Sequence, residues 1–344
     1  MLMGGRSSEH EISLASGRSV REALSPAEYD VVAIEIGRDG RWELPPAPNG
    51  RVPAELGPGS DPEPRPGETL PVPAESRAVA TTLADVDVVL PILHGPFGED
   101  GTVQGLLELA DVAYVGAGHG ASYVCMDKDV FKSVMRDKGI PVTRSVTLRE
   151  GEEVRNPFDY PVFVKPAQLG SSIGITKVRE ESDLAEAVAL AFRHGEKVLV
   201  EEFVDGVEVE VGVVGNLEPI ASLPGQVVAN FADWYDYSSK YDEGGSDLLV
   251  PPPGLTQQQI ERAQTVAVDA FRASDCEGMA RADMFVRACD GTVVVNELNT
   301  IPGFTATSFY ARLFEASGIA YPELLDRLIE LAIERHERRK RYLY

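Results

Sequence analysis

The sequence of 344 residues is poor in cysteine and in long apolar runs, and each shortage excludes a class of protein. Three cysteines, Cys125, Cys276 and Cys289, match neither a zinc motif nor a disulfide framework, so we expect small buried residues. No stretch reaches the ~18 apolar residues of a membrane-spanning helix. The start of the chain also lacks the basic and apolar regions of a signal peptide, so we expect a cytoplasmic protein.

Positive charge is scarce as well, with 32 Lys and Arg against 55 Asp and Glu and a formal net charge of −23. Nucleic acids and anionic membranes bind basic surfaces, so we expect neither as a partner. A phosphate-bearing small molecule stays possible, because a few well-placed lysines and arginines can overcome the global field locally. The chain is 43% apolar and can bury sizeable cores. Its length suggests about two or three domains.

The first part of the chain, residues 1–117, alternates predicted strands and helices. This alternation is typical of an α/β unit with a mainly parallel sheet. A capping box with Ser8 as N-cap and Glu11 three residues later predicts the start of the first helix. Residues 45–75 are rich in Pro, Gly and Glu, a composition that cannot form a core and indicates an exposed insertion.

The remainder of the chain divides near residue 206. Residues 118–206 predict a smaller α+β unit that begins with one helix over about 122–138. Residues 207–344 contain a long polar loop at 226–253, followed by a helix, a hairpin and terminal helices. The charged last stretch, 334–344, is typical of a solvated helix end rather than a binding tail.

The predicted hairpin carries the most informative cluster of polar residues. Arg281 and Asp283 alternate with apolar residues, an Asp-Gly turn follows at 290–291, and Glu297 and Asn299 alternate in the returning strand. Period two puts each pair on one face of its strand. Carboxylate and amide oxygens without His or Cys suit Mg²⁺ or Mn²⁺. A plain polar strand face is the alternative, but the Thr-Ile-Pro-Gly turn that follows favours a metal site.

A second pattern indicates phosphate binding. Lys165 ends a predicted strand, and the loop 170–174 (GSSIG) follows, which supplies a cation and backbone N–H donors. No Walker A motif occurs. Further along, residues 201–204 (EEFV) join two segments, where backbone groups could read an adenine edge and a glutamate could accept from ribose hydroxyls. Ordinary hairpins also contain such loops, so neither pattern decides the function by itself.

Residues 116–121 (GAGHGA) satisfy the G-x-G-x-x-G/A pattern of dinucleotide-binding folds and precede a predicted helix. The strand before them is short, however. No strand with an acidic end lies ~20 residues further on, where Arg136 and Asp137 fall in a predicted helix. We therefore interpret the segment as an interdomain turn, which leaves a hydride-transfer enzyme as a distant alternative.

These segments together resemble, in the same order, the signatures of D-alanine-D-alanine ligases, members of the ATP-grasp superfamily. The resemblance covers nearly the whole chain and implies a three-domain ATP-grasp architecture with an N-terminal parallel α/β domain. It implies ATP-dependent ligation of two D-alanines, through an acyl phosphate, for peptidoglycan precursors. The matching segments are those around Glu9, Lys128 and Lys165, GSSIG, EEFVDGVEVEV, 94–105 (HGPFGEDGTVQG), 281–283 (RAD) and 296–303 (NELNTIPG).

The resemblance also implies how ATP, the metal and the oxyanion would be bound. Two Mg²⁺ or Mn²⁺ ions would be held by Asp283, Glu297 and Asn299. Arg281 and the Gly303 N–H would stabilise the oxyanion of a tetrahedral intermediate. The residues that would contact ATP are Lys128, Lys165, Ser172, Glu201, Glu202, Phe203, Val204 and Glu208.

The two amino acids would be bound on the other side of the phosphates, by the same resemblance. Glu9, with His94 nearby, would bind the ammonium of the first D-alanine, and Ser308 with the Phe309 backbone would bind the carboxylate of the second. The loop 226–253 would act as a lid. In it, Tyr241 would hydrogen-bond Ser171 and Glu9, and Lys240 would reach phosphate. The resemblance further implies a possible homodimer.

Two other functions stay open at this point. One is another ATP-grasp ligase, such as a D-alanine:D-lactate enzyme, although Tyr241 in the lid favours the dipeptide product among relatives. The other is a nucleotide-binding protein without turnover. The second alternative is disfavoured by the presence of a full set of candidate catalytic and metal residues, which are Lys165, Arg281, Asp283, Glu297 and Asn299.

Overall fold

The structure is a computed structural model that describes residues 1–43, 82–83, 85–229 and 246–343. Within these residues the strands form four sheets. The insertion 45–75 lies outside the described residues, and so do Lys240 and Tyr241 of the predicted lid. No helix in the described ranges has the length and apolar character needed to cross a membrane.

The N-terminal part is an α/β unit, as the alternation predicted. Strand β1 is parallel to both of its neighbours, β2 and β5, whereas β3 pairs antiparallel with β2 at the edge. A second pair, β4 and β6, is also parallel. The elements are β1 (Leu2–Gly4), α1 (His10–Ala23), β2 (Ile34–Ile36), β3 (Trp42–Glu43), β4 (Val88–Val89), β5 (Pro91–Ile92), α3 (Thr102–Leu109) and β6 (Ala113–Tyr114).

Helix α1 begins at His10, with Glu9 rather than Ser8 at the N-cap, so the predicted capping box is wrong. The hydroxyl of Ser7 accepts the Glu9 N–H at 3.2 Å and donates to the carbonyl oxygen of His94 at 2.6 Å. Ser7 thereby ties the start of the helix to the loop after β5, and no side chain among the described residues caps the helix. Glu9 and His94 are brought to the same end of the sheet.

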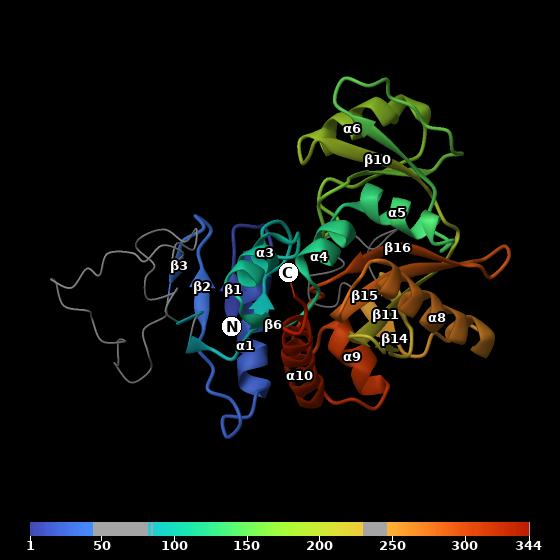
Figure 1. Ribbon diagram of the computed structural model, residues 1–344. Helices are drawn as coiled ribbons and strands as arrows, with labels where there is room; N and C mark the ends of the chain where they lie inside the picture. Colours follow the sequence, from blue (N-terminus) through green and yellow to red (C-terminus); the bar gives the residue numbers. More distant parts are fainter. Residues whose placement is uncertain (44–81, 84, 230–245, 344) are drawn as a thin grey trace.

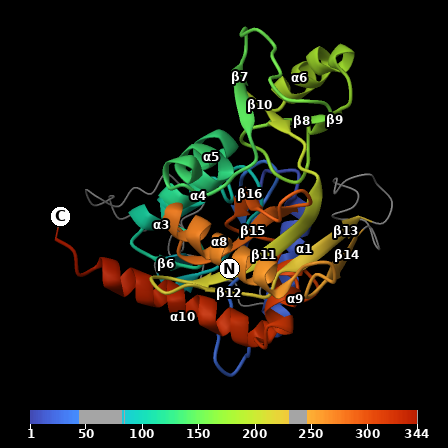
Figure 2. The same ribbon diagram turned by 90° about the vertical axis from the view of Figure 1, so that its right-hand side faces the viewer.

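The central part is an antiparallel sheet of order β7-β10-β8-β9, covered by α6 (Figures 1 and 2). The helix predicted over 122–138 is two helices, α4 and α5, with a break at Asp127. The Asp127 carboxylate accepts the N–H groups of Asp129 and Val130, which starts α5 with Lys128 as its first residue. The elements are α4 (His119–Met126), α5 (Lys128–Asp137), β7 (Ser145–Arg149), β8 (Val162–Pro166), β9 (Thr176–Val178), η2 (Glu181–Asp183), α6 (Leu184–Phe192) and β10 (Lys197–Glu202).

The C-terminal part is built on a sheet of order β14-β13-β11-β15-β16, with β12 paired to β11. The loop predicted over 226–253 is wrong at its ends, because 226–229 and 246–249 pair as the antiparallel strands β13 and β14. Helix α8 packs on the face that carries Val211 and Ala282, whereas α9 and α10 pack on the face that carries Val214 and Met279. Figure 2 shows α10 running beneath this sheet. The elements are β11 (Gly206–Gly215), β12 (Ile220–Ala221), β13 (Gly225–Ala229), β14 (Ser246–Leu249), α8 (Gln257–Ala273), β15 (Gly278–Arg287), β16 (Val293–Asn299), α9 (Phe309–Ala316) and α10 (Tyr321–Arg339).

The glycine-rich segment 116–121 is a turn between β6 and α4. Gly116 has a positive φ of 95° and packs against Gly278 at the start of β15, where an added Cβ would lie 3.1 Å from Gly116 backbone atoms. Arg335 of α10 donates to the carbonyl oxygens of Gly116 and Tyr114. The turn thus contacts the C-terminal part of the chain.

The charged end of α10 and one cysteine differ from expectation. Arg335 is only 3% exposed, so the end of this helix is not simply solvated. Its guanidinium donates a hydrogen bond to the Gly116 carbonyl oxygen, a long-range contact that local sequence does not reveal. Cys125 and Cys276 are buried as expected, whereas Cys289 is exposed because it lies in the hairpin turn after β15.

Candidate active site

Two cavities meet between the three parts of the chain. The first, which we call the Glu9 cavity, has a volume of about 370 Å³ and lies between α1, the loop after β5 and the residues following β16. The second, the Lys165 cavity, has a volume of about 260 Å³ and lies between the central and C-terminal sheets. Gly170, Ser171 and Glu297 line both cavities. A molecule in one cavity would therefore lie beside a molecule in the other.

The hairpin of β15 and β16 presents its polar face to this junction. Arg281 is opposite Asn299 and Asp283 is opposite Glu297, and the pairing shifts directly after Asp283. The side chain of Arg281 donates from Nε and Nη2 to both oxygens of Asp283, each at 2.7 Å. Asn299 donates to Asp283 at 2.9 Å. The period-two prediction that these four residues share one end and one face of the hairpin is confirmed.

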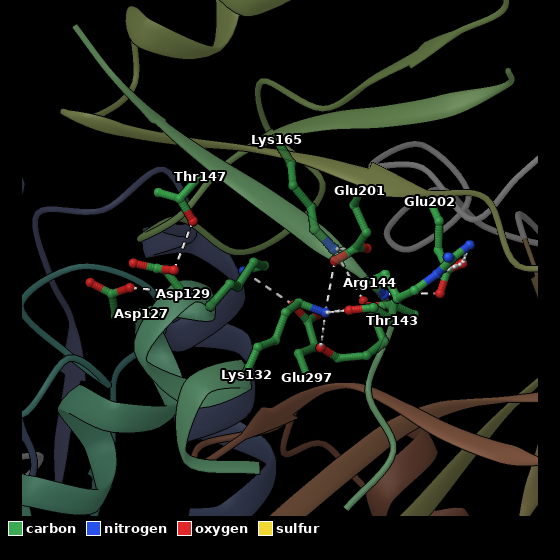
Figure 3. Close-up of polar contacts among 12 residues, drawn as sticks. Asp127, Asp129, Lys132, Thr143, Arg144, Thr147, Lys165, Glu201, Glu202 and Glu297 are labelled. Carbon is green, nitrogen blue, oxygen red and sulfur yellow. Dashed lines mark hydrogen bonds and ion pairs between the residues drawn. The ribbon is translucent and has the colours of Figure 1, made fainter. Parts of the chain in front are cut away.

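Glu201 lies between two lysines (Figure 3). Its Oε1 is 2.6 Å from Lys165 Nζ and its Oε2 is 2.7 Å from Lys132 Nζ. Burial by itself would raise the pKa of Glu201, but the two ammonium groups lower it to about 2. Burial lowers the pKa of Lys132 to about 8, although Glu201 opposes that shift. The carboxylate of Glu201 is therefore ionised at neutral pH.

Glu202 is placed differently from its neighbour. Its side chain accepts from Arg144 Nε at 2.7 Å and from Arg287 Nη2 at 2.6 Å, as Figure 3 shows for Arg144. Burial would raise the pKa of Glu202, but these hydrogen bonds and the arginine charges lower it. Glu202 lines the Lys165 cavity, yet its carboxylate bridges the central part of the chain and β15.

Lys128 connects the loop that follows β8, which contains residues 170–174, to the hairpin of β15 and β16. Its Nζ donates to the carbonyl oxygen of Leu169 at 2.9 Å and lies 3.1 Å from Glu297 Oε2. The loop itself is unusual, because Ser171 and Ser172 have positive φ values of 53° and 57°. Left-handed serines bend the backbone sharply, which suits a loop that turns N–H groups toward an anion.

Glu9 and His94 lie together in the Glu9 cavity. Ser171 donates to Glu9, which connects the helix start to the loop on the far side of the cavity. His94 is buried, and its Nδ1 hydrogen-bonds the carbonyl oxygen of Ile301 at 3.0 Å. Its Nε2 has no hydrogen-bond partner among the described residues. Burial lowers the pKa of His94, although Glu9 opposes the shift, so its ring favours the neutral form. The cavity can therefore receive an ammonium group between a carboxylate and a neutral imidazole.

The predicted metal ligands fit a divalent cation by donor chemistry. Asp283 and Glu297 offer carboxylates, and Asn299 offers an amide oxygen, the hard donors that Mg²⁺ and Mn²⁺ prefer. Glu297 lines both cavities, whereas Asn299 lines the Glu9 cavity and Asp283 lines the Lys165 cavity. The described residues contain no group of three or more His, Cys, Asp or Glu that could hold a metal. Two carboxylates and an amide would need phosphate oxygens or water to complete a coordination shell.

Every predicted site residue in the described part of the chain lines one or both of these cavities. Lys240 and Tyr241 lie outside the described residues. The predicted residues that line the Glu9 cavity are Glu9, His94, Ser171, Arg281, Glu297, Asn299, Gly303, Ser308 and Phe309. Those that line the Lys165 cavity are Lys128, Lys165, Ser171, Ser172, Glu201, Glu202, Phe203, Val204, Glu208, Asp283 and Glu297.

Sequence reasoning missed several residues of the site. Phe163 and Phe285 line the Lys165 cavity, and each lies two positions from a predicted residue on the same strand, so period two could have found them. Glu99 lines the Glu9 cavity and accepts the Gly95 N–H at 3.0 Å. Burial and the nearby Glu9 raise the pKa of Glu99 to about 8. Lys132 is fully buried, and nothing in the local sequence separates it from other helix lysines.

Two sheets that enclose a lysine-rich cavity, with an oxygen-rich hairpin at its mouth, are typical of the ATP-grasp class of enzymes. The family model for the N-terminus of D-ala D-ala ligases matches residues 1–117, and that for the C-terminus matches residues 134–330. The chain belongs to the D-alanine-D-alanine ligase family.

Individual relatives agree along the whole chain. It is 42% identical to a D-alanine--D-alanine ligase of Geobacillus thermodenitrificans, covering 100% of this chain and 97% of the relative. It is 43% identical to D-alanine--D-alanine ligase A of Mesorhizobium japonicum, covering 98% of each chain.

Solved structures show the same likeness in three dimensions. The structure of the D-alanine-D-alanine ligase from Coxiella burnetii has a TM-score of 0.80 and 34% identity, covering 98% of this chain and 94% of that one. A D-Ala:D-Ser ligase from Enterococcus faecalis has a TM-score of 0.77 and 33% identity, covering 96% and 98%. The Bacillus anthracis ligase complexed with ATP has a TM-score of 0.76 and 25% identity, covering 98% of each chain.

Proposed function

We propose that the chain joins two D-alanines to D-alanyl-D-alanine, with cleavage of ATP to ADP and phosphate. The observation that carries the proposal is the shared wall of the two cavities, Gly170, Ser171 and Glu297. This wall would put the terminal phosphate of a nucleotide in the Lys165 cavity beside an amino acid in the Glu9 cavity. Membership of the family supports the same activity and its place in peptidoglycan synthesis.

The chemistry needs activation of a carboxylate before an amide bond can form. A carboxylate oxygen of the first D-alanine would attack the terminal phosphorus, which breaks the bond to ADP and gives an acyl phosphate. The amine of the second D-alanine would then attack the acyl carbon, and inorganic phosphate would leave. Lys128 and Lys165 would bind the phosphate oxygens, while Glu9 and His94 would hold the ammonium of the first D-alanine.

The second half of the reaction would develop negative charge on the former carbonyl oxygen. Arg281, fixed by its ion pair with Asp283, and the Gly303 N–H would stabilise this oxyanion. Ser308 and the Phe309 backbone, at the start of α9, would bind the carboxylate of the second D-alanine. A carboxylate at a helix N-terminus is favoured by the exposed N–H groups.

Adenosine would occupy the apolar end of the Lys165 cavity. Phe163 and Phe285 line it, so a purine could stack there. Backbone groups of residues 201–204 would provide polar contacts to the base, and Glu208 would accept from ribose hydroxyls. Ser172 would cover the phosphates, while Glu202 and Phe203 would shape the connection between the two sheets.

Asp283, Glu297 and Asn299 would hold Mg²⁺ or Mn²⁺, and two ions are proposed. Bound metal would neutralise charge between the phosphate oxygens. We further propose that the segment between β13 and β14 closes as a lid, with Tyr241 toward Ser171 and Glu9 and Lys240 toward phosphate. Such a lid would exclude water, which would otherwise hydrolyse the acyl phosphate.

Release of phosphate that depends on D-alanine tests the proposal. With ATP and Mg²⁺ present, we expect phosphate and D-alanyl-D-alanine in equal amounts only when D-alanine is added. L-Alanine is the control substrate. Tight nucleotide binding without D-alanine-dependent phosphate would instead favour a nucleotide-binding protein without turnover.

A second candidate is ligation of D-alanine to a different second substrate. It is favoured by the likeness to the D-Ala:D-Ser ligase of Enterococcus faecalis, which is 33% identical. Competition between D-alanine, D-serine and D-lactate for the second position, near neutral pH, separates the alternatives. We expect the dipeptide of D-alanine to be the main product, and a predominance of either rival would reassign the specificity.

The division into domains at residues 117 and 206, a homodimer and a cytoplasmic location are also proposals. Separate hydrophobic clusters within residues 2–114 and within residues 148–200 support the division. The cluster of the C-terminal sheet also contains Phe131 and Met135 of α5, so this helix packs with the C-terminal part. The family resemblance supports the dimer. Light scattering of the purified protein would give twice the chain mass if a dimer forms, and fractionation of cells would test the location.

A further inference from the structure

Lys132 is a buried lysine behind the Lys165 cavity. It lies four residues after Lys128 on α5, so the two lysines project from the same side of that helix. Lys128 and Lys165 line the cavity, whereas Lys132 does not and is 0% exposed. A fully buried ammonium is costly unless it is paired, so its partners should explain why it is there.

The partners of Lys132 connect three segments. Its Nζ lies 2.7 Å from Glu201 Oε2 and donates to the hydroxyl of Thr143 (Figure 3). It also donates to the carbonyl oxygen of Asn296 at 3.3 Å. The ion pair joins α5 to β10. The hydrogen bond to Thr143 reaches the segment just before β7, and the one to Asn296 reaches β16. Of these contacts only the one to Glu201 requires a positive charge.

Glu201 transmits this contact to the cavity. Its other oxygen, Oε1, lies 2.6 Å from Lys165 Nζ, which also donates to Asn296 Oδ1 at 3.1 Å. Glu201 thus has one cation on each oxygen, one inside the cavity and one behind it. The three side chains together carry a net charge of +1. If Lys132 were neutral, Glu201 and Lys165 would form a pair with no net charge.

We propose that Lys132 is a positioning residue for the nucleotide, one that holds Glu201 from behind so that Lys165 keeps its positive charge available to phosphate. This inference rests on the proposed function only in taking the Lys165 cavity as the nucleotide site. Lys132 itself touches neither nucleotide nor substrate. It acts by sharing the charge of a carboxylate that would otherwise compete with phosphate oxygens for Lys165.

A purely structural role is the alternative. In that case Lys132 would serve to tie α5 to Thr143 and Asn296, and any loss of nucleotide binding would follow from a displaced helix. The two roles differ in how they depend on Glu201. If Lys132 acts by sharing the charge of Glu201, it should no longer affect nucleotide binding once Glu201 is neutral. If Lys132 only ties the segments together, its effect on binding should be the same with and without that charge.

A double-mutant cycle separates the two roles. The full-length protein, Lys132→Met, Glu201→Gln and the double variant are titrated calorimetrically with Mg²⁺ and the non-hydrolysable analogue β,γ-imido-ATP. We expect Lys132→Met to weaken analogue binding about tenfold in the natural background and less than twofold in the Glu201→Gln background. Lys138→Met, which removes an exposed lysine just after α5, is the matched control and should leave binding unchanged.

The cycle also states what would overturn the inference. Equal weakening by Lys132→Met in both backgrounds, or none in the natural background, contradicts the charge-sharing role. If Lys132→Met alone does not fold, the comparison of Glu201→Gln with the double variant still decides, since tenfold weaker binding by the double variant would contradict it. Phosphate release by the natural protein is measured separately, because analogue binding does not depend on ligation.

Discussion

Arg281 and Asp283 form a two-bonded ion pair along one strand, in which Nε and Nη2 each lie 2.7 Å from a different carboxylate oxygen. Arg281 Nε also lies 3.1 Å from Glu210 Oε2 on the neighbouring strand β11. The guanidinium is therefore held in one orientation before any substrate arrives. A cation fixed in this way can stabilise charge that appears during a reaction without having to reorganise.

Replacing Arg281 by alanine should lower turnover far more than it lowers nucleotide affinity. We expect a loss of about 10²–10³-fold in kcat, the range found when a preorganised oxyanion contact is removed. Binding of β,γ-imido-ATP should change by no more than a few fold, because that analogue carries no tetrahedral carbon. Steady-state phosphate release and calorimetry measure the two quantities. Parallel losses in both would show that Arg281 serves to shape the hairpin.

Glu297 provides a prediction about metal dependence, since it lines both cavities. Chelation with EDTA should abolish D-alanine-dependent phosphate release, and added Mg²⁺ should restore it. Glu297→Gln should raise the Mg²⁺ concentration for half-maximal rate at least tenfold, because an amide is a weaker ligand than a carboxylate. Glu261→Gln on the exposed side of α8 is the control. An unchanged metal requirement in Glu297→Gln would remove Glu297 from the metal site.

Much of the hairpin of β15 and β16, and the loop 170–174, could be predicted from the sequence. Alternation along 281–283 and 297–299 fixes which side chains share a face, and an Asp-Gly turn fixes how the strands return. The structure pairs Asp283 with Glu297 accordingly. Such relations depend only on local geometry, which the order of residues determines directly.

The missed features depend on contacts between distant segments. The break at Asp127 is missed because the apolar pattern of the sequence continues through it. The Asp127 carboxylate caps α5, and a single capping residue leaves no periodic signal in the sequence. Asp127 is also held by Lys197 at 2.5 Å, a partner 70 positions along the chain. The burial of Arg335 against the Gly116 turn has the same origin, since helix charge patterns do not reveal what the helix packs against.

Glu99 gives a prediction about pH, because its folded pKa of about 8 lies above its usual value of 4.5. Burial is the largest cause of this raised pKa, and the charge of Glu9 is the second largest. Glu297 raises it further, whereas the Gly95 N–H and Lys128 lower it. The folded protein then binds a proton that the unfolded chain releases, so the stability from this group is fully present below pH 4.5. That stability is lost as the pH rises toward 8.

Glu99→Gln should therefore stabilise the ligand-free protein at pH 8 relative to pH 5. Each pKa unit corresponds to about 1.4 kcal/mol and Glu99 is only partly buried, so we expect a gain on the order of 2 kcal/mol. Urea denaturation at both pH values measures the difference in the free energy of unfolding. Glu150→Gln, at an exposed position, is the control. A difference between Glu99→Gln and the natural protein that does not grow with pH would contradict the raised pKa.

Gly278 has a φ of +77°, and a Cβ there would lie 3.1 Å from three backbone atoms of Gly116. Alanine at this position would strain the backbone and push apart the Gly116 turn and β15, so Gly278→Ala should lower the free energy of unfolding by about 1–3 kcal/mol. Gly120→Ala makes the same chemical change in the exposed first turn of α4, where a Cβ meets no atom of the described part of the chain within 4 Å. This variant should leave stability unchanged or slightly higher. Urea denaturation of both variants provides the comparison. Equal stabilities would mean that the close approach of the two glycines does not hold these parts of the chain together.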